Sequence, residues 1–216
     1  MTRPGAWRRA PAKSANLLLI LLLTLLIVAL LAGGYTRVRP QVGFSNGLRA
    51  PVRLAVAQDL PRTVAPGGSV RVPVPWGKTT LVTWELIRPL SADGKPMGEE
   101  IRGSVLAPGS WGTTRRSARA RSSDGDYFAP LITNASEDLL RVTVNAGLEG
   151  SRDCGCAVRP GARRAFIGYY PLYQNSTVLA RAGARRSAAF RNLGPQVVAP
   201  DGAIGLRFES KDLRAP

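Results

Sequence analysis

The chain has 216 residues, of which 44% are hydrophobic, and it carries a formal net charge of +16 and no histidine. This length and apolar content are sufficient for one domain with a substantial hydrophobic core. The lack of histidine excludes Ser–His and Cys–His nucleophilic catalysis, attachment of a c-type haem, and the commonest metal-ligating side chain. Because the sequence offers no positive evidence for catalysis, we expect a protein that is not an enzyme.

The chain begins with a basic head, residues 1–14. It contains four basic side chains and no acidic one: Arg3, Arg8, Arg9 and Lys13. Positive charge before a first apolar segment favours a cytoplasmic N-terminus. We therefore expect residues 1–14 to lie in the cytoplasm.

Residues 15–35 are predicted to form a single transmembrane helix. The run from Leu17 to Ala32 has no charge, and a helix over 15–35 would be roughly 31 Å long at ~1.5 Å per residue, enough to cross a bilayer core. The alternative is a signal peptide cleaved near Ala32–Gly34, but the apolar run exceeds the usual ~7–15 residues. An uncleaved anchor in the inner (cytoplasmic) membrane is the favoured interpretation.

The remaining chain would then lie in the bacterial periplasm. It has 26 basic and 14 acidic side chains, and 26 of the 30 basic residues of the whole chain are arginine. The choice of arginine is typical of a GC-rich bacterial genome, but the excess of positive charge is not explained by codon usage. We expect partners that are anionic lipid headgroups or acidic protein surfaces, and no nucleic acid, because an exported domain rarely meets it.

Residues 36–47 are expected to be a juxtamembrane linker, and residues 48–216 a β-domain. Seven segments have the alternation or the β-branched content of strands, and none after the anchor has helical periodicity. These segments are residues 51–58, 69–76, 79–87, 139–147, 165–170, 176–182 and 202–210. Short strands between Gly/Pro turns predict an all-β fold, specifically an Ig-like β-sandwich.

A proline-containing turn signature recurs four times along this domain. It reads "VAPGG" at Val64, "LAPGS" at Leu106, "VRPGA" at Val158 and "VAPDG" at Val198. A Pro–Gly pair favours a type II turn, in which the glycine has a positive φ. The spacing is too irregular for a repeat array, so we interpret these turns as corners of one sandwich.

Two segments, residues 88–100 and 108–126, are expected to be long surface loops. The second carries the densest arginine run in the chain: Arg115, Arg116, Arg119 and Arg121. A solvated loop is one interpretation. The other is a docking surface, because arginine pairs bidentately with carboxylates and phosphates.

Cys154 and Cys156 are the only cysteines, and a single glycine separates them. An oxidising compartment favours a local disulfide, and Gly155 permits the bend that brings the two sulfurs together. Two free thiols are the second alternative. The third is a soft metal site for copper or zinc, whose ligand set Met1, Met97, carboxylates or a partner would complete.

Three other motifs are assigned no site. "PWGKTT" at Pro75 resembles the end of a phosphate-binding loop but has Val72 where that loop requires glycine. Asp124 and Asp126 lack the further oxygen ligands of a calcium loop. The sequons at Asn134 and Asn175 are interpreted as strand ends, where asparagine competes well for backbone hydrogen bonds.

These observations predict a non-catalytic accessory or assembly subunit that stabilises an integral-membrane complex, and a respiratory or photosynthetic complex is the class that we expect. No cofactor is expected. The alternative is a membrane-anchored copper or thiol-redox chaperone that uses Cys154 and Cys156. The order of basic head, anchor, exported β-domain and C-x-C pair is similar to that of the copper-insertion proteins serving cytochrome oxidase. Those proteins have aromatic residues where this chain has Gly155 and Ala157, so the resemblance assigns no family.

Overall fold

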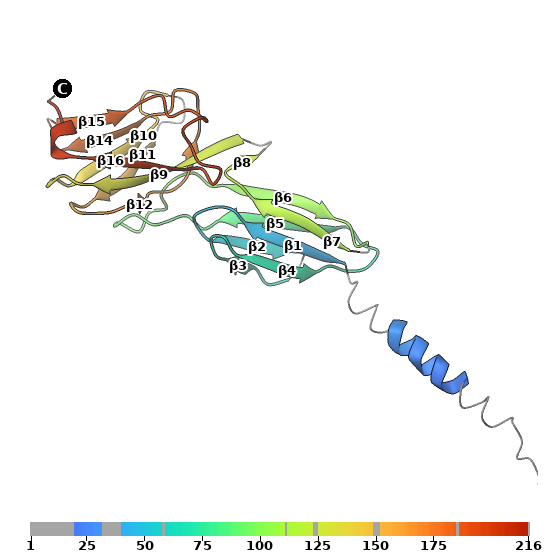
Figure 1. Cartoon of the computed structure of the whole chain (residues 1–216). Coiled ribbons are helices and arrows are strands. Elements are labelled where there is room, and N and C mark those ends of the chain that lie inside the picture. Colours follow the sequence, from blue (N-terminus) through green and yellow to red (C-terminus); the bar gives the residue numbers. More distant parts are fainter. Residues whose placement is uncertain are drawn as a thin grey trace, which may run out of the picture.

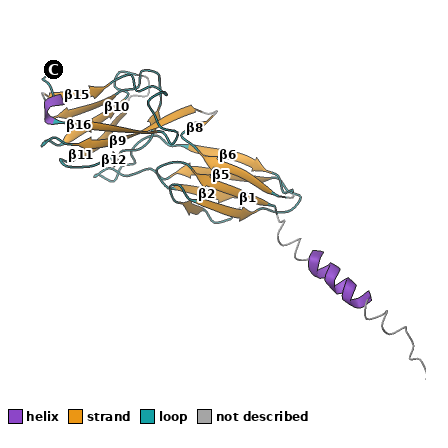
Figure 2. Cartoon of the chain, in the orientation of Figure 1, coloured by secondary structure: helices purple, strands orange, loops and turns teal. Residues whose placement is uncertain are grey.

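The computed structural model describes residues 20–31, 40–57, 59–110, 112–122, 125–148, 152–184 and 186–215. The described chain consists mainly of β-strands, in agreement with the predicted all-β class, and Figure 2 shows how the strands dominate it. Its only helical elements are residues 20–31 and the short 3-10 helix Ser210–Asp212.

The helix at residues 20–31 covers the central part of the predicted 15–35 span, and the ends of that span lie outside the described residues. Its leucine, isoleucine and valine side chains are exposed. The Thr24 hydroxyl donates a 2.8 Å hydrogen bond to the carbonyl of Ile20. Among the described residues, no helix combines the length and the apolar character needed to cross a membrane.

The first seven strands form two sheets, and we call residues 40–120 the N-terminal unit. One sheet has the order β4-β1-β7 and the other the order β3-β2-β5-β6. Alternate residues of both sheets are buried, as period-2 side-chain alternation requires. The strands are β1 Gln41–Asn46, β2 Val52–Val56, β3 Arg62–Val64, β4 Ser69–Pro73, β5 Thr80–Leu86, β6 Arg102–Ala107 and β7 Thr113–Ala118.

The later strands form a second pair of sheets, and we call residues 121–215 the C-terminal unit. One sheet has the order β11-β10-β14-β15, and in the other β9 pairs with β8, β12, β13 and β16. The strands are β8 Arg121–Ser122, β9 Gly125–Asn134, β10 Leu140–Val144, β11 Arg152–Val158, β12 Ala165–Phe166, β13 Tyr170–Pro171, β14 Val178–Ala182, β15 Arg186–Phe190 and β16 Ala203–Phe208.

Each unit has its own hydrophobic core, although the sequence analysis expected one β-domain over residues 48–216. One cluster of buried side chains draws on both sheets of the N-terminal unit and includes Phe44 and Leu54. The other draws on both sheets of the C-terminal unit and includes Phe128 and Phe208. Figure 1 shows the two groups of strands lying end to end.

The two units have the same topology, a duplication that the sequence analysis did not detect. In the N-terminal unit, β1 pairs antiparallel with β4 and parallel with β7. In the C-terminal unit, β9 likewise pairs antiparallel with β12 and parallel with β16. The second sheets, β3-β2-β5-β6 and β11-β10-β14-β15, have equivalent orders and are antiparallel throughout. β8 and β13 are additions specific to the C-terminal unit.

A buried asparagine ends the equivalent strand of each unit. Asn46 ends β1, and its side-chain amide donates to the carbonyls of Ala50, at 2.9 Å, and Val64, at 3.0 Å. Its side-chain oxygen accepts a 2.9 Å bond from the backbone N–H of Leu48. The backbone carbonyl of Asn46 accepts from the N–H of Gly67, in the first Pro–Gly turn. We call this arrangement the asparagine clasp.

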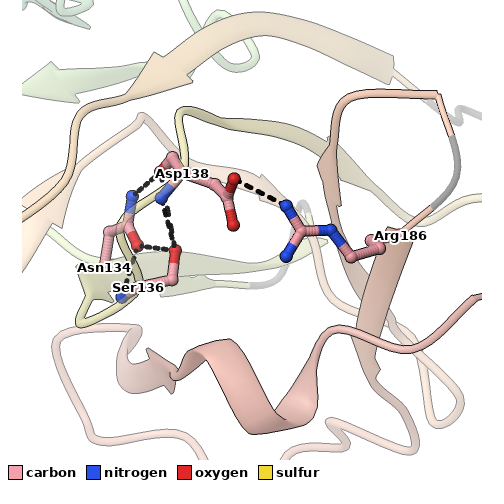
Figure 3. Close-up of polar contacts among 4 residues, drawn as sticks. All are labelled: Asn134, Ser136, Asp138 and Arg186. Carbon is pink, nitrogen blue, oxygen red and sulfur yellow. Dashed lines mark hydrogen bonds and ion pairs between the residues drawn. The ribbon is translucent and has the colours of Figure 1, made fainter.

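The clasp recurs at Asn134, which ends β9 and so confirms the interpretation of this residue as a strand end. Its amide donates to the carbonyls of Asp138, at 2.8 Å, and Val158, at 2.9 Å. Its side-chain oxygen accepts bonds from the backbone N–H and the hydroxyl of Ser136. Figure 3 shows this clasp and the 2.7 Å ion pair between Asp138 and Arg186 of β15.

The Pro–Gly turns are therefore corners of two similar units. Gly67 and Gly161 occupy equivalent turns and have positive φ angles of 69° and 75°, as predicted. Gly161 donates to the carbonyl of Asn134 in the same way that Gly67 donates to that of Asn46. Gly109, in the second signature, is buried and has no positive φ, and an added Cβ atom there would collide with the backbone of Pro75 and Lys78.

Two predicted irregular segments contain strands. The predicted linker 36–47 includes β1, the central strand of its sheet, and the predicted loop 108–126 includes β7, β8 and the start of β9. Both segments are rich in glycine, serine or arginine on the face that points away from the core, which weakens the apolar alternation of a strand. Residues 88–100 do form a long connection, with one isolated bridge between Leu90 and Pro96.

Candidate functional site

The four arginines predicted as docking residues do not lie on one loop. Arg115 and Arg116 are adjacent in β7, so their side chains point to opposite faces of the sheet. Arg119 follows the strand, and its Nε donates a 2.7 Å bond to the hydroxyl of Ser117. Arg121 belongs to β8, and its side chain is outside the described part of the structure.

Cys154 and Cys156 lie in β11, and the structure joins their sulfurs as a disulfide with the Cα atoms 5.0 Å apart. The pairing with β10 shifts register at this bend: Val142 lies opposite Cys156 and Thr143 opposite Asp153, so the two residues between them in β11 bulge. Cys156 is buried and Cys154 is partly buried. A disulfide that closes so short a loop constrains the unfolded chain little, so it fixes the local backbone more than it stabilises the fold.

The thioether of Met97 lies against this disulfide, 3.3 Å from the sulfur of Cys156. Met97 belongs to the N-terminal unit, in the connection between β5 and β6, and packs on the core of the C-terminal unit. The structure thus gathers three sulfur atoms from two units. Among the described residues, no three His, Cys, Asp or Glu side chains are grouped in a way that would hold a metal ion.

A second group of side chains joins the two units at Tyr169, which is fully buried. Its hydroxyl accepts a 2.9 Å hydrogen bond from the backbone N–H of Arg49 and donates a 2.8 Å bond to the carbonyl of Asp201. The Arg49 side chain also forms a 2.8 Å ion pair with the Asp201 carboxylate. The ring packs edge-on to Phe166. We call this group of residues, with Gly98, the junction.

The connection between β5 and β6 completes the junction. The backbone N–H of Glu99 donates a 2.7 Å bond to the carbonyl of Tyr169. Gly98 has a φ of 77°, and its α-carbon lies so close to Gly168 and Tyr169 that a Cβ atom would be 2.7 Å from the Tyr169 carbonyl oxygen. Sequence reasoning interpreted residues 88–100 as a surface loop, and nothing in its composition indicated that it binds the other unit.

Burial raises the pKa of Tyr169 to about 12, from its ordinary value of 10.0. The folded state holds the neutral phenol, so the stability this group contributes is complete below pH 10 and is lost as the pH rises toward 12. Two pKa units correspond in full to about 3 kcal/mol, most of which is lost between pH 10 and pH 12.

We therefore expect Tyr169→Phe to reduce the alkaline sensitivity of the protein. Between pH 10 and pH 12, the wild type should lose about 2 kcal/mol more unfolding free energy than Tyr169→Phe in urea titrations. Tyr173→Phe, at a side chain that is 37% exposed, is the control and should behave as the wild type does. The prediction would be contradicted if Tyr169→Phe lost as much unfolding free energy between pH 10 and pH 12 as the wild type does.

Comparison with known proteins assigns no family. No family model matches the chain, and no curated protein proved related to it in sequence.

Proposed function

We propose that this chain is a non-catalytic accessory subunit, anchored in the inner membrane of a bacterium, whose exported β-units stabilise an integral-membrane complex. A respiratory or photosynthetic complex is the class that we expect. We further propose that each unit is an Ig-like β-sandwich, because in each a four-stranded sheet shares one core with a second sheet, which has three strands in the N-terminal unit and five in the C-terminal unit.

The junction is the observation that carries this proposal. Two units joined in sequence are by default free to move relative to each other. Here the buried Tyr169 hydroxyl bridges backbone groups of both units, and Gly98 allows close backbone contact. A rigid two-unit arm is suited to holding other subunits at a fixed distance, whereas a hinged pair would suit an enzyme that closes on a substrate.

The apolar N-terminal segment supports the anchor. Residues 20–31 are helical, their large apolar side chains are exposed, and the single hydroxyl, that of Thr24, is satisfied within the helix. This combination is stable in lipid, where a backbone must satisfy its own polar groups. The adjoining residues of the run from Leu17 to Ala32 extend the apolar length beyond the described helix.

The position of Met97 favours a second candidate, the copper or thiol-redox chaperone. If a dithiol reductant opened the disulfide, the thiolates of Cys154 and Cys156 would lie beside the Met97 thioether. Three sulfur ligands form a soft set that suits copper(I). In this alternative the β-units would position the sulfur site relative to the membrane.

One purification separates the two candidates. We expect tagged full-length protein to remain in the membrane after carbonate washing and, in mild detergent, to migrate with a large complex whose members mass spectrometry identifies. Migration as a single chain would contradict the accessory role. If that single chain, once reduced, also bound one copper(I) ion and lost this binding in Met97→Leu, the chaperone would be the better description.

A further inference from the structure

On the outer face of the β4-β1-β7 sheet, the strand register aligns three residues in one row across the strands. Gly43 of β1 lies opposite Arg71 of β4 on one side and opposite Arg115 of β7 on the other. Side chains in register on neighbouring strands point to the same face, so the two arginines flank a position that has no side chain. The next row on this face consists of hydroxyl side chains only: Ser45, Ser69 and Ser117.

This row borders a shallow hollow of about 300 Å³. The hollow is lined by residues of β1, β4 and β7, among them Thr113 and both arginines, and its lining contains no acidic residue. Arg71 and Arg115 are exposed, and none of the ion pairs in the described ranges includes either of them. The hollow therefore presents positive charge and hydroxyl groups without an internal counter-charge.

The C-terminal unit shows that the fold does not require arginine in this row. The equivalent strands place Leu131 of β9 between Phe166 of β12 and Gly205 of β16. Leu131 is only 3% exposed, and Phe166 packs against the core of the N-terminal unit. The C-terminal unit thus uses this row for its apolar contact with the N-terminal unit. In the N-terminal unit the equivalent row is open and basic, and it lies beside a row of hydroxyl side chains.

The basic row lies near the end of the N-terminal unit where the chain enters from the apolar segment. Pro40 directly precedes β1, and its carbonyl accepts a 3.0 Å bond from Val74 at the end of β4. The turn that follows carries Trp76, which is 46% exposed, and the exposed Lys78. Tryptophan is enriched at membrane–water interfaces.

We propose that the Arg71–Gly43–Arg115 row binds the head group of an anionic phospholipid. This proposal rests on the anchored location given under the proposed function, and it names one partner of the basic surface. The planar guanidinium groups would grip the phosphate from two sides, and the serine hydroxyls would donate to its remaining oxygens. Gly43 places no side chain between the arginines, and the methyl group of Thr113, 3.2 Å from where its Cβ would lie, borders this position.

The test uses the full-length protein in non-ionic micelles that contain phosphatidylglycerol or phosphatidylcholine. Native mass spectrometry measures the affinity for each lipid. Arg71→Gln/Arg115→Gln should bind phosphatidylglycerol about tenfold more weakly than the wild type, because two exposed charge contacts are lost. The matched control, Arg62→Gln/Arg102→Gln, removes the same charge from the other sheet of the unit and should leave the affinity unchanged.

A third variant separates the site from general positive charge. Gly43→Thr keeps both arginines but fills the hollow, so phosphatidylglycerol binding should fall as in the double variant while the melting temperature stays near that of the wild type. Undiminished phosphatidylglycerol binding in Arg71→Gln/Arg115→Gln would overturn the proposal. Equal weakening in Arg62→Gln/Arg102→Gln would also overturn it.

Two other outcomes would assign the row to a different ligand and overturn the lipid proposal. Inorganic phosphate that binds as tightly as the lipid, with the same arginine dependence, would make the row a free phosphate site. Loss of a protein partner from the double variant, with no change in lipid affinity, would make it a protein contact. Carbonate extraction of the wild type tests the anchor separately, so failure of the anchored function and failure of the lipid site give different results.

Discussion

Replacing Asn134 by alanine is expected to lower the free energy of unfolding by about 3 kcal/mol. The side chain is fully buried and satisfies the carbonyls of Asp138 and Val158 and two donors of Ser136. Alanine would leave these groups without partners in the interior, and each unsatisfied buried group costs about 1–3 kcal/mol. The clasp also fixes the corner where β9 ends, so its loss would loosen the turn that follows.

Urea unfolding, followed by far-UV circular dichroism, measures the change in the free energy of unfolding. Asn175→Ala is the matched control, because Asn175 is the other sequon asparagine but lies exposed in a turn; we expect it to change stability by less than ~0.5 kcal/mol. Asn46→Ala should cost about as much as Asn134→Ala, since its amide makes the equivalent bonds in the other unit. A loss below ~1 kcal/mol in both clasp variants would contradict this account.

Replacing Gly98 by alanine is expected to destabilise the protein by about 3 kcal/mol, because two separate costs add. A non-glycine residue at a φ of 77° costs roughly 1–2 kcal/mol. A Cβ atom there would also be 2.7 Å from the carbonyl oxygen and 2.8 Å from the nitrogen of Tyr169, and overpacking of this kind costs about 1–3 kcal/mol. Both neighbours are backbone atoms, which cannot rotate away as a side chain does.

Gly94→Ala separates the two costs. Gly94 lies in the same connection with a φ of 75°, and nothing lies within 4 Å of its added Cβ. We expect Gly94→Ala to show only the conformational cost, and Gly98→Ala to show in addition faster amide exchange at Glu99 and around Tyr169. Equal destabilisation by the two substitutions would mean that the contact with Tyr169 does not hold the units together.

Several β-strands were predictable because one face of the strand is apolar and the other polar. The alternation of Val52, Leu54 and Val56 located β2, and the valines of β4 and β10 did the same, because each such strand lies between a core and solvent. Prediction failed for β7, whose sequence "TTRRSA" is almost wholly polar. It also failed for β11, where Gly155 and the two cysteines interrupt the pattern.

The sequence by itself determined the all-β class, the uncharged run near the N-terminus, the role of Asn134 at a strand end and the turns at Gly67 and Gly161. These features depend on residues that are close in the chain, through side-chain alternation and backbone conformation. Only the tertiary structure decided that the chain holds two equivalent units, because the duplication is carried by backbone pairing that many side chains satisfy equally well. Three features join segments that are far apart in sequence: the junction at Tyr169, the contact of Met97 with Cys156, and the row Arg71–Gly43–Arg115. Such contacts are set by strand register and packing rather than by any local pattern.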